Sequence, residues 1–209
     1  KLPIAILPGG SANGMAKEIG IPNDPQKALD IVTTGTVKLI DLIRINDQLC
    51  IHLGDIGFNA FVVKTFETFE ARGMWGYIKA SWKVLWRNRR MQVTISTDTE
   101  FVKREAAMVV FANASKYGTG AVINPAGELD DGLFEVVVMK RVALSEIFKM
   151  MVTHKPYDPE KVELFHTTSL NIQSKHKVHF QVDVEYLGKI NSLEAGITPG
   201  ALYIVVPKS

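Results

Sequence analysis

The sequence LPGGSANGMA, residues 7–16, decides how the start of this chain folds. An apolar run over residues 3–7 leads into it, and a short helical pattern covers residues 13–19. A strand that breaks at glycines and restarts as a helix directs free backbone N–H groups toward one point, where phosphate oxygens commonly bind. Candidate nucleotide-binding residues are therefore Gly9, Gly10, Ser11 and Asn13. An ordinary capped strand-to-helix connection is the alternative, because the stretch matches neither a Walker loop nor a dinucleotide fingerprint.

Beyond residue 36 the pattern changes from mostly helical to mostly strand-like. Helical periodicity predicts helices at 25–33, 58–69, after residue 73, and 144–153. Alternating or short apolar runs predict strands at 36–46, 49–53, 91–97, 104–113, 121–124, 133–139, 161–173, 179–184 and 201–206. We therefore predict an α+β protein. Residues 1–36 would be the remnant of an α/β nucleotide-binding domain, and residues 37–209 a mostly antiparallel β-sandwich whose last strand can return to the first domain.

Composition limits the classes of protein and partner. With 209 residues, 46% hydrophobic and 22% charged, the chain can bury a full core. A net charge of +2 gives no indication of a nucleic-acid partner. Cys50 is the single cysteine, which fits a reducing, cytoplasmic compartment. No apolar run reaches the roughly 18 residues of a transmembrane segment, so we expect none.

Two acidic stretches could carry chemistry. ELDDGL at 128–133 places three carboxylates within four residues at a turn, a donor set suited to Mg²⁺ or Ca²⁺. A hairpin turn is the alternative there, since Asp-Gly is a favoured turn pair. Asp183 and Glu185 lie two apart in a predicted strand, so both carboxylates should leave the same face. Such a pair would raise one pKa, as a general base requires, although the solvated face of an amphipathic strand is the alternative.

A basic stretch with all three tryptophans covers residues 72–97. Trp75, Trp82 and Trp86 fall on one helical stripe, and no acidic residue lies between Arg72 and Thr97. This pattern is typical of an element that lies on a membrane surface. The alternative is that the stripe packs on the neighbouring sheet.

Together these stretches resemble the diacylglycerol kinase catalytic-domain family of lipid kinases, which includes bacterial diacylglycerol kinase-like and sphingosine kinase-like enzymes. Six segments in the family's order carry the resemblance: LPGGSANGMA (7–16), IDL (40–42), GDIGFNA (54–60), NASKYG (113–118), DDGL (130–133) and DVE (183–185). They span nearly the whole chain.

The resemblance implies an ATP-dependent kinase that phosphorylates a hydroxyl of diacylglycerol or a sphingoid-type lipid at a membrane surface. It implies that Ser11 meets the phosphates, and that Asp131 binds Mg²⁺ together with backbone oxygens of Glu128 and Leu133. Glu185, or its neighbour Asp183, would be the general base. The implied protein is cytoplasmic, can associate peripherally with membrane, and allows a homodimer.

Two departures from the family modify these expectations. Its Gly-Gly-Asp-Gly-Thr segment, upstream of the glycine turn, is absent, so we expect a C-terminal fragment that is inactive alone. Val184 stands where the family usually has glycine, and a β-branched residue should avoid the positive φ that glycine allows. An NAD kinase-like enzyme is one alternative, because that family looks similar in architecture. A non-catalytic lipid- or nucleotide-binding module is another, which Val184 makes plausible.

Overall fold

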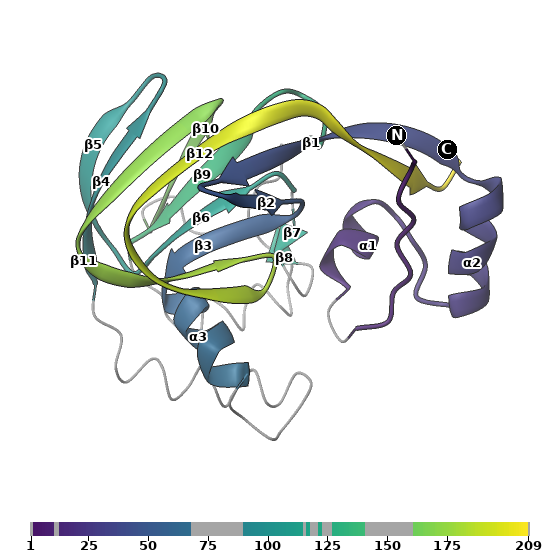
Figure 1. The fold of residues 1–209 in the computed structure, drawn as a ribbon, viewed down its shortest axis with the longest axis horizontal. Coiled ribbons are helices and arrows are strands. Elements are labelled where there is room, and N and C mark those ends of the chain that lie inside the picture. The colour runs from purple at the N-terminus through teal and green to yellow at the C-terminus, as the bar shows by residue number, and fades with distance from the viewer. Residues whose placement is uncertain are drawn as a thin grey trace.

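The computed structural model describes residues 2–10, 13–67, 90–114, 116–117, 121–122, 127–140 and 161–208 (Figure 1). The described helices are α1 (Gly14–Glu18), α2 (Pro25–Thr34) and α3 (Phe58–Glu67). The first described strands are β1 (Thr36–Ile45), β2 (Gln48–Cys50), β3 (Leu53–Gly57), β4 (Met91–Thr97), β5 (Phe101–Ala106), β6 (Met108–Ala112), β7 (Lys116–Tyr117) and β8 (Ala121–Val122). The remaining ones are β9 (Phe134–Met139), β10 (Val162–Thr167), β11 (Ser169–Val182) and β12 (Glu185–Val206).

Ten of the described strands form one antiparallel sheet that curls around its own core. Its order is β10-β9-β6-β3-β11-β12-β1-β2, and β4 also pairs with β11 and carries β5 at its other edge. β7 and β8 form a separate small hairpin. The long strands β11 and β12 curve across the whole sheet (Figure 1). The architecture confirms the predicted α+β class with a mostly antiparallel β region.

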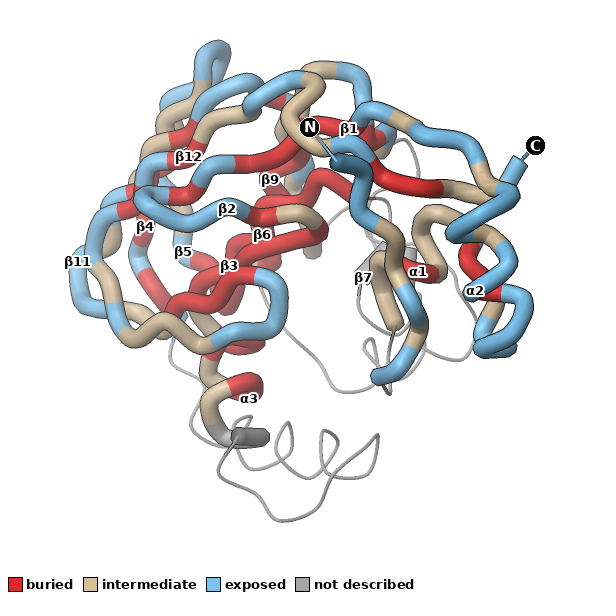
Figure 2. Tube along the Cα trace, turned by 45° about the vertical axis from the view of Figure 1, so that its right-hand side comes forward, coloured by how far each residue is buried: buried red, intermediate tan, exposed pale blue. Residues whose placement is uncertain are grey.

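The centre of the sheet is buried on both faces. Alternate residues of β6 and β9, including Phe111 and Val136, pack in the largest core cluster on one face. Their neighbours Val110 and Val137 pack against Phe58 and Val62 of α3 on the other face. Figure 2 shows β3, β6 and β9 as the most continuously buried strands. Burial on both faces explains why their sequences read as unbroken apolar runs and not as alternation.

The end of β12 reaches the first residues of the chain. Ile4 forms a parallel bridge with Ile204, in which Ile4 N donates to Tyr203 O at 2.8 Å and Val205 N donates to Ile4 O at 2.9 Å. The two termini therefore lie close together beside α2 (Figure 1). α2 begins where predicted, because the carboxylate of Asp24 accepts a hydrogen bond from Lys27 N at 2.9 Å.

Several predicted strand limits are wrong. The single strand expected at 104–113 is interrupted at Ala107, whose carbonyl accepts a hydrogen bond from Phe58 N at 3.0 Å. The strand expected at 161–173 is interrupted at Thr168, and β3 was missed as a strand separate from β2. In both interrupted strands a backbone group bonds to a distant segment, which a local pattern does not reveal.

Other predictions lie outside the described residues. These are Ser11, the helix at 144–153, and the tryptophan stretch with Trp75, Trp82 and Trp86. Among the described helices, none has the length and apolarity needed to cross a bilayer.

Candidate functional site

The glycine turn is closed by its own asparagine. Gly10 N donates to Asn13 Oδ1 at 2.8 Å, and Asn13 has a positive φ of 51° immediately before α1. A side chain at Gly9 would meet no heavy atom within 4 Å, so one side of the turn is open. The predicted break between an extended segment and a helix is therefore present. The oxygen of Asn13, a predicted nucleotide ligand, is already used inside the turn.

A small apolar cluster, which we call the junction cluster, joins segments that are far apart in the sequence. Its members come from the N-terminal segment, α1 and the residue after it, the middle of β1, the end of β12, and the loops after β2, β6 and β8. The residues are Ile40, Ala114, Leu129 and Ile204, with Ile6, Met15, Ile19, Ile51, Leu202 and Val206 packed against them. The junction cluster therefore brings four features into one region. They are the glycine turn at Gly9 and Gly10, Asp41, Asn113, and the turn at residues 128–133, which we call the acidic turn.

The buried residue Asp41 holds the acidic turn in place through hydrogen bonds. Its carboxylate is 2% exposed and accepts hydrogen bonds from Gly132 N and Gly200 N, both at 2.7 Å. Its backbone N donates to Leu129 O at 2.7 Å, and its carbonyl accepts from Asn113 Nδ2 at 2.8 Å. The sequence offered IDL as part of a motif without assigning Asp41 a role. A carboxylate inside an otherwise apolar strand was the signal for it.

The predicted metal ligands share one turn held by these bonds. Asp131 Oδ1 accepts from Leu133 N at 2.9 Å, while Glu128 and Asp131 are exposed. Asp130 instead pairs with Lys38 at 2.8 Å. Within the described residues no group of three or more His, Cys, Asp or Glu side chains gathers as a metal site. The donor set, one carboxylate with the carbonyls of Glu128 and Leu133, fits Mg²⁺, which commonly keeps several water ligands.

Asn113 has an unusual environment in this region. Its side chain is fully buried, and its Oδ1 has no hydrogen-bond partner among the described residues. Its backbone N donates to His52 O at 3.2 Å. This bond connects the end of β6 to the loop after β2.

The expectation that Asp183 and Glu185 lie on one strand is wrong. β11 ends at Val182 and β12 begins at Glu185, so Asp183 and Val184 form a two-residue turn with φ values of 47° and 71°. Two positive φ angles in such a loop define a type I′ hairpin, which matches the twist of the flanking strands. The expectation that Val184 would avoid positive φ is therefore also wrong.

The Asp183 carboxylate is taken up by the loop after β2. It accepts hydrogen bonds from the backbone N of Ile51 at 2.8 Å and from those of His52 and Leu53 at 3.0 Å. The Sγ of Cys50 lies 3.6 Å from the same carboxylate. Burial, and then the charge of Asp183, raise the pKa of the Cys50 thiol well above its ordinary value. Glu185 is exposed at the beginning of β12.

A buried polar network that sequence reasoning missed connects this turn to α3. The carboxylate of Asp55 accepts from Ala60 N at 2.8 Å, Asn59 Nδ2 at 2.6 Å and Gln181 Nε2 at 2.5 Å. Gln181 Oε1 in turn accepts from Val184 N at 2.7 Å. The motif GDIGFNA contained the signal, a carboxylate three residues before a helix, but its partner Gln181 lies 126 residues away.

An aromatic and basic cluster joins α3 to β11 and β12. His179 stacks on Phe61 with ring centroids 4.5 Å apart, and its Nδ1 is 2.8 Å from the hydroxyl of Tyr186. Burial, with added repulsion from Lys189 and Lys64, lowers the pKa of His179 to about 4. The imidazole is therefore neutral at physiological pH.

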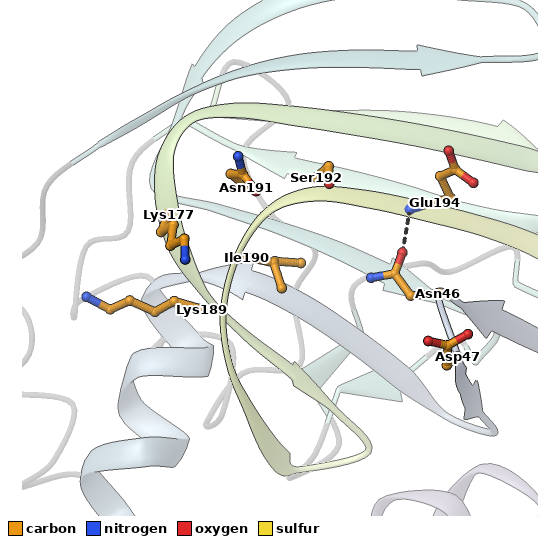
Figure 3. A pocket seen from close by; sticks show the side chains of 8 residues that line it. All are labelled: Asn46, Asp47, Lys177, Lys189, Ile190, Asn191, Ser192 and Glu194. Atoms are coloured by element: carbon orange, nitrogen blue, oxygen red, sulfur yellow. Dashed lines mark hydrogen bonds between the residues drawn. The ribbon is translucent and has the colours of Figure 1, made fainter.

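An open hollow of about 580 Å³ lies over the β1–β2 turn and the middle of β11 and β12. Figure 3 shows its lysines at one end and its acidic side chains at the other. Its lining residues are Asn46, Asp47, Lys177, Lys189, Ile190, Asn191, Ser192 and Glu194. None of the predicted site residues is among them, so we place the candidate site at the junction cluster and the β11–β12 turn.

Comparison with protein-family models shows to which family the chain belongs. The family model described as "YegS C-terminal NAD kinase beta sandwich-like domain" matches residues 55–206, which is most of the chain. The model described as "Diacylglycerol kinase catalytic domain" matches residues 1–45. The chain belongs to the diacylglycerol kinase-like family. This confirms the family that the six motifs indicated.

Relatives in this family are distant. A protein named diacylglycerol kinase from Mycobacterium tuberculosis is 25% identical over 219 residues, which covers 99% of this chain and 70% of the relative. A protein from Synechocystis is 26% identical over 217 residues. This chain spans about half the length of the Synechocystis relative, 50%, and about two thirds of others such as a YegS-like protein of Chromohalobacter salexigens, 67%.

Solved structures show the same fold. A diacylglycerol kinase from Bacillus anthracis superposes with a TM-score of 0.71 at 19% identity, covering 99% of this chain and 67% of that one. A second chain from the same organism gives a TM-score of 0.79 at 18% identity, with coverages of 99% and 70%. At these identities the likeness shows the fold alone.

Proposed function

We propose that this chain is part of an ATP- and Mg²⁺-dependent lipid kinase. It would transfer the γ-phosphoryl group to a hydroxyl of diacylglycerol or a sphingoid-type lipid at a membrane surface. Membership of the diacylglycerol kinase-like family supports the reaction class. The observation that carries the proposal is the junction cluster, because it gathers the glycine turn and the acidic turn beside the loop that binds Asp183.

Each part of this region has a role in the proposal. Gly9 and Ser11 of the glycine turn contact the phosphates, while the N–H of Gly10 is bonded to Asn13 and shapes the turn. Asp131 and the carbonyls of Glu128 and Leu133 would hold Mg²⁺, which would supply positive charge beside the phosphates. Asp41 keeps this acidic turn in place through its bonds to Gly132 N and Gly200 N.

We assign the general base to Glu185 in preference to Asp183. Asp183 already accepts three backbone hydrogen bonds and serves to fix the turn. Glu185 is exposed and can take the proton from the lipid hydroxyl as that oxygen forms its bond to the γ-phosphorus. The bond from this phosphorus to the bridging oxygen of ATP breaks, and ADP leaves.

An NAD kinase-like activity is the second candidate. The family model that covers residues 55–206 is described as NAD kinase beta sandwich-like, so the same sheet occurs in a family with a different acceptor. In that case the hydroxyl would belong to NAD and the product would be NADP.

Incubation of the full natural protein with γ-labelled ATP, Mg²⁺ and a panel of lipid vesicles tests the proposal. We expect labelled phospholipid from diacylglycerol or a sphingoid-type lipid, and none without Mg²⁺. A parallel reaction with NAD distinguishes the second candidate. Formation of NADP without labelled lipid would overturn the lipid kinase proposal.

A further inference from the structure

The turn between β11 and β12 carries a residue that is unfavourable for its conformation. Val184 has a φ of 71° and is 63% exposed, so packing of its side chain does little to hold it there. Left-handed backbone is a genuine outlier for a β-branched residue, because Cβ approaches the carbonyl oxygen. Type I′ turns normally use glycine or asparagine at such positions. Something other than local preference must therefore keep this turn in shape.

Gln181 makes the bond that holds Val184. Its side chain is completely buried, its Oε1 accepts from Val184 N at 2.7 Å, and its Nε2 donates to Asp55 Oδ2 at 2.5 Å. A backbone N–H can only donate and a carboxylate can only accept. A carboxamide is thus the group that suits both partners at once.

The other end of this connection is fixed to a rigid element. Asp55, which is 0% exposed, accepts hydrogen bonds from Ala60 N and Asn59 Nδ2 at the beginning of α3. Asp183, the first residue of the turn, is separately bound by the backbone N–H groups of the loop after β2. Asp183 is therefore held by groups outside the hairpin, and Val184 is held by a β11 side chain that is itself bonded to Asp55 outside the hairpin.

We propose that Gln181 is a positioning residue that holds Val184 in its left-handed conformation and so fixes Glu185, the next residue. This inference rests on the proposed role of Glu185 as general base. It gives a reason why valine is accepted at a position where type I′ turns normally use glycine or asparagine. Without the Gln181 bond, Val184 relaxes toward negative φ and the turn moves Glu185 away from the lipid hydroxyl. A displacement of about 1 Å can lower a rate on the order of a hundredfold.

Substitution in the full natural protein tests the proposal. Gln181→Met keeps the approximate volume and loses both hydrogen bonds. We expect kcat to fall about a hundredfold with the KM for ATP unchanged. Adding Val184→Gly to Gln181→Met should restore kcat, because glycine adopts positive φ without strain. Asn59→Ala is the matched comparison, since it removes another donor from Asp55 and leaves the Gln181–Val184 bond intact. Its kcat should fall much less than that of Gln181→Met.

Three results would overturn the proposal. They are an unaltered kcat in Gln181→Met, no recovery on adding Val184→Gly, or an equal loss of kcat in Asn59→Ala. Should Gln181→Met fail to fold, the unaltered protein still provides a test. The Val184 amide proton should exchange slowly with solvent because Gln181 Oε1 accepts it, and fast exchange would contradict the bond itself.

Failure of the proposed function can be told apart from failure of this inference. If the unaltered protein phosphorylates no lipid, the kinase proposal fails, and the urea midpoint of each variant then tests the inference. Val184→Gly should raise the midpoint more in the unaltered protein, where Gln181 holds Val184 in the strained conformation, than in the Gln181→Met background, where Val184 has already relaxed. Equal shifts in the two backgrounds would show that Gln181 does not hold the turn.

Discussion

Replacing Asp41 with asparagine tests whether a buried carboxylate holds the acidic turn. Both oxygens of Asp41 accept backbone hydrogen bonds at 2.7 Å, from Gly132 N and Gly200 N. Asparagine has one acceptor oxygen, and its NH₂ group would face a second N–H donor. Loss of a bond to a charged acceptor costs about 1.5–3 kcal/mol, and each buried unsatisfied donor costs about 1–3 kcal/mol. Removing the cost of burying a charge offsets part of this, which leaves about 3 kcal/mol of destabilisation.

Thermal unfolding measures this loss. For a chain of this size about 3 kcal/mol lowers Tm by about 6–12 °C. Asp47→Asn is the matched control, because Asp47 is exposed in the turn after the same strand and should change stability by less than about 0.5 kcal/mol. In the full natural protein, Asp41→Asn should also raise the Mg²⁺ concentration needed for half-maximal activity. Equal melting temperatures for the two variants would refute the role given to Asp41.

Three further predictions concern pH, sterics and thiol chemistry. His179 has a folded-state pKa of about 4 against an ordinary 6.5, so its contribution to stability is complete above about pH 6.5 and is lost as pH falls toward 4. Between pH 4 and 7, Tm should therefore change less with pH in His179→Gln than in the unaltered protein. The control His176→Gln, at an exposed histidine, should keep the original pH dependence of Tm. Gly57→Ala should lower the free energy of unfolding by about 2–5 kcal/mol, because φ is 102° and a Cβ would lie 2.6 Å from a backbone carbonyl oxygen. The comparison in urea unfolding is Gly9→Ala, whose Cβ would have nothing within 4 Å. Equal urea midpoints for the two variants would contradict the geometry at Gly57. Cys50 should resist a thiol reagent at pH 8 in the native protein, because burial raises its pKa, and should react on unfolding; rapid native labelling would contradict its burial.

Patterns within one segment predicted much of the fold. The apolar pattern of β1 and the aspartate before α2 placed those elements correctly, because strand propensity and a helix cap are local properties. The alternation did not predict burial, since residues 40–43 of β1 are all buried. The interruption at Ala107 could not be read this way. It depends on Gly57, whose positive φ brings the beginning of α3 against the Ala107 carbonyl.

The site was less accessible to sequence reasoning than the fold. An Asp-Gly pair at positions 183–184 would have predicted a hairpin turn, but this chain has Asp-Val there. Because valine favours strands, the sequence predicted a continuous strand through the turn. Its conformation depends on Gln181 and on the loop bound by Asp183, which are long-range contacts. The role of Asp41 was likewise hidden, because its partners Gly132 and Gly200 are 91 and 159 residues away.

The most direct test of lipid kinase function compares the full natural protein with its Glu185→Gln variant. Both would be incubated with γ-labelled ATP, Mg²⁺ and vesicles that contain diacylglycerol or a sphingoid-type lipid, after circular dichroism has shown that both are folded. We predict labelled phospholipid from the unaltered protein and a kcat about 10² to 10⁴ lower for Glu185→Gln, the contribution of a general base. Absence of labelled lipid from the unaltered protein, or equal kcat values for the two proteins, would contradict the proposal.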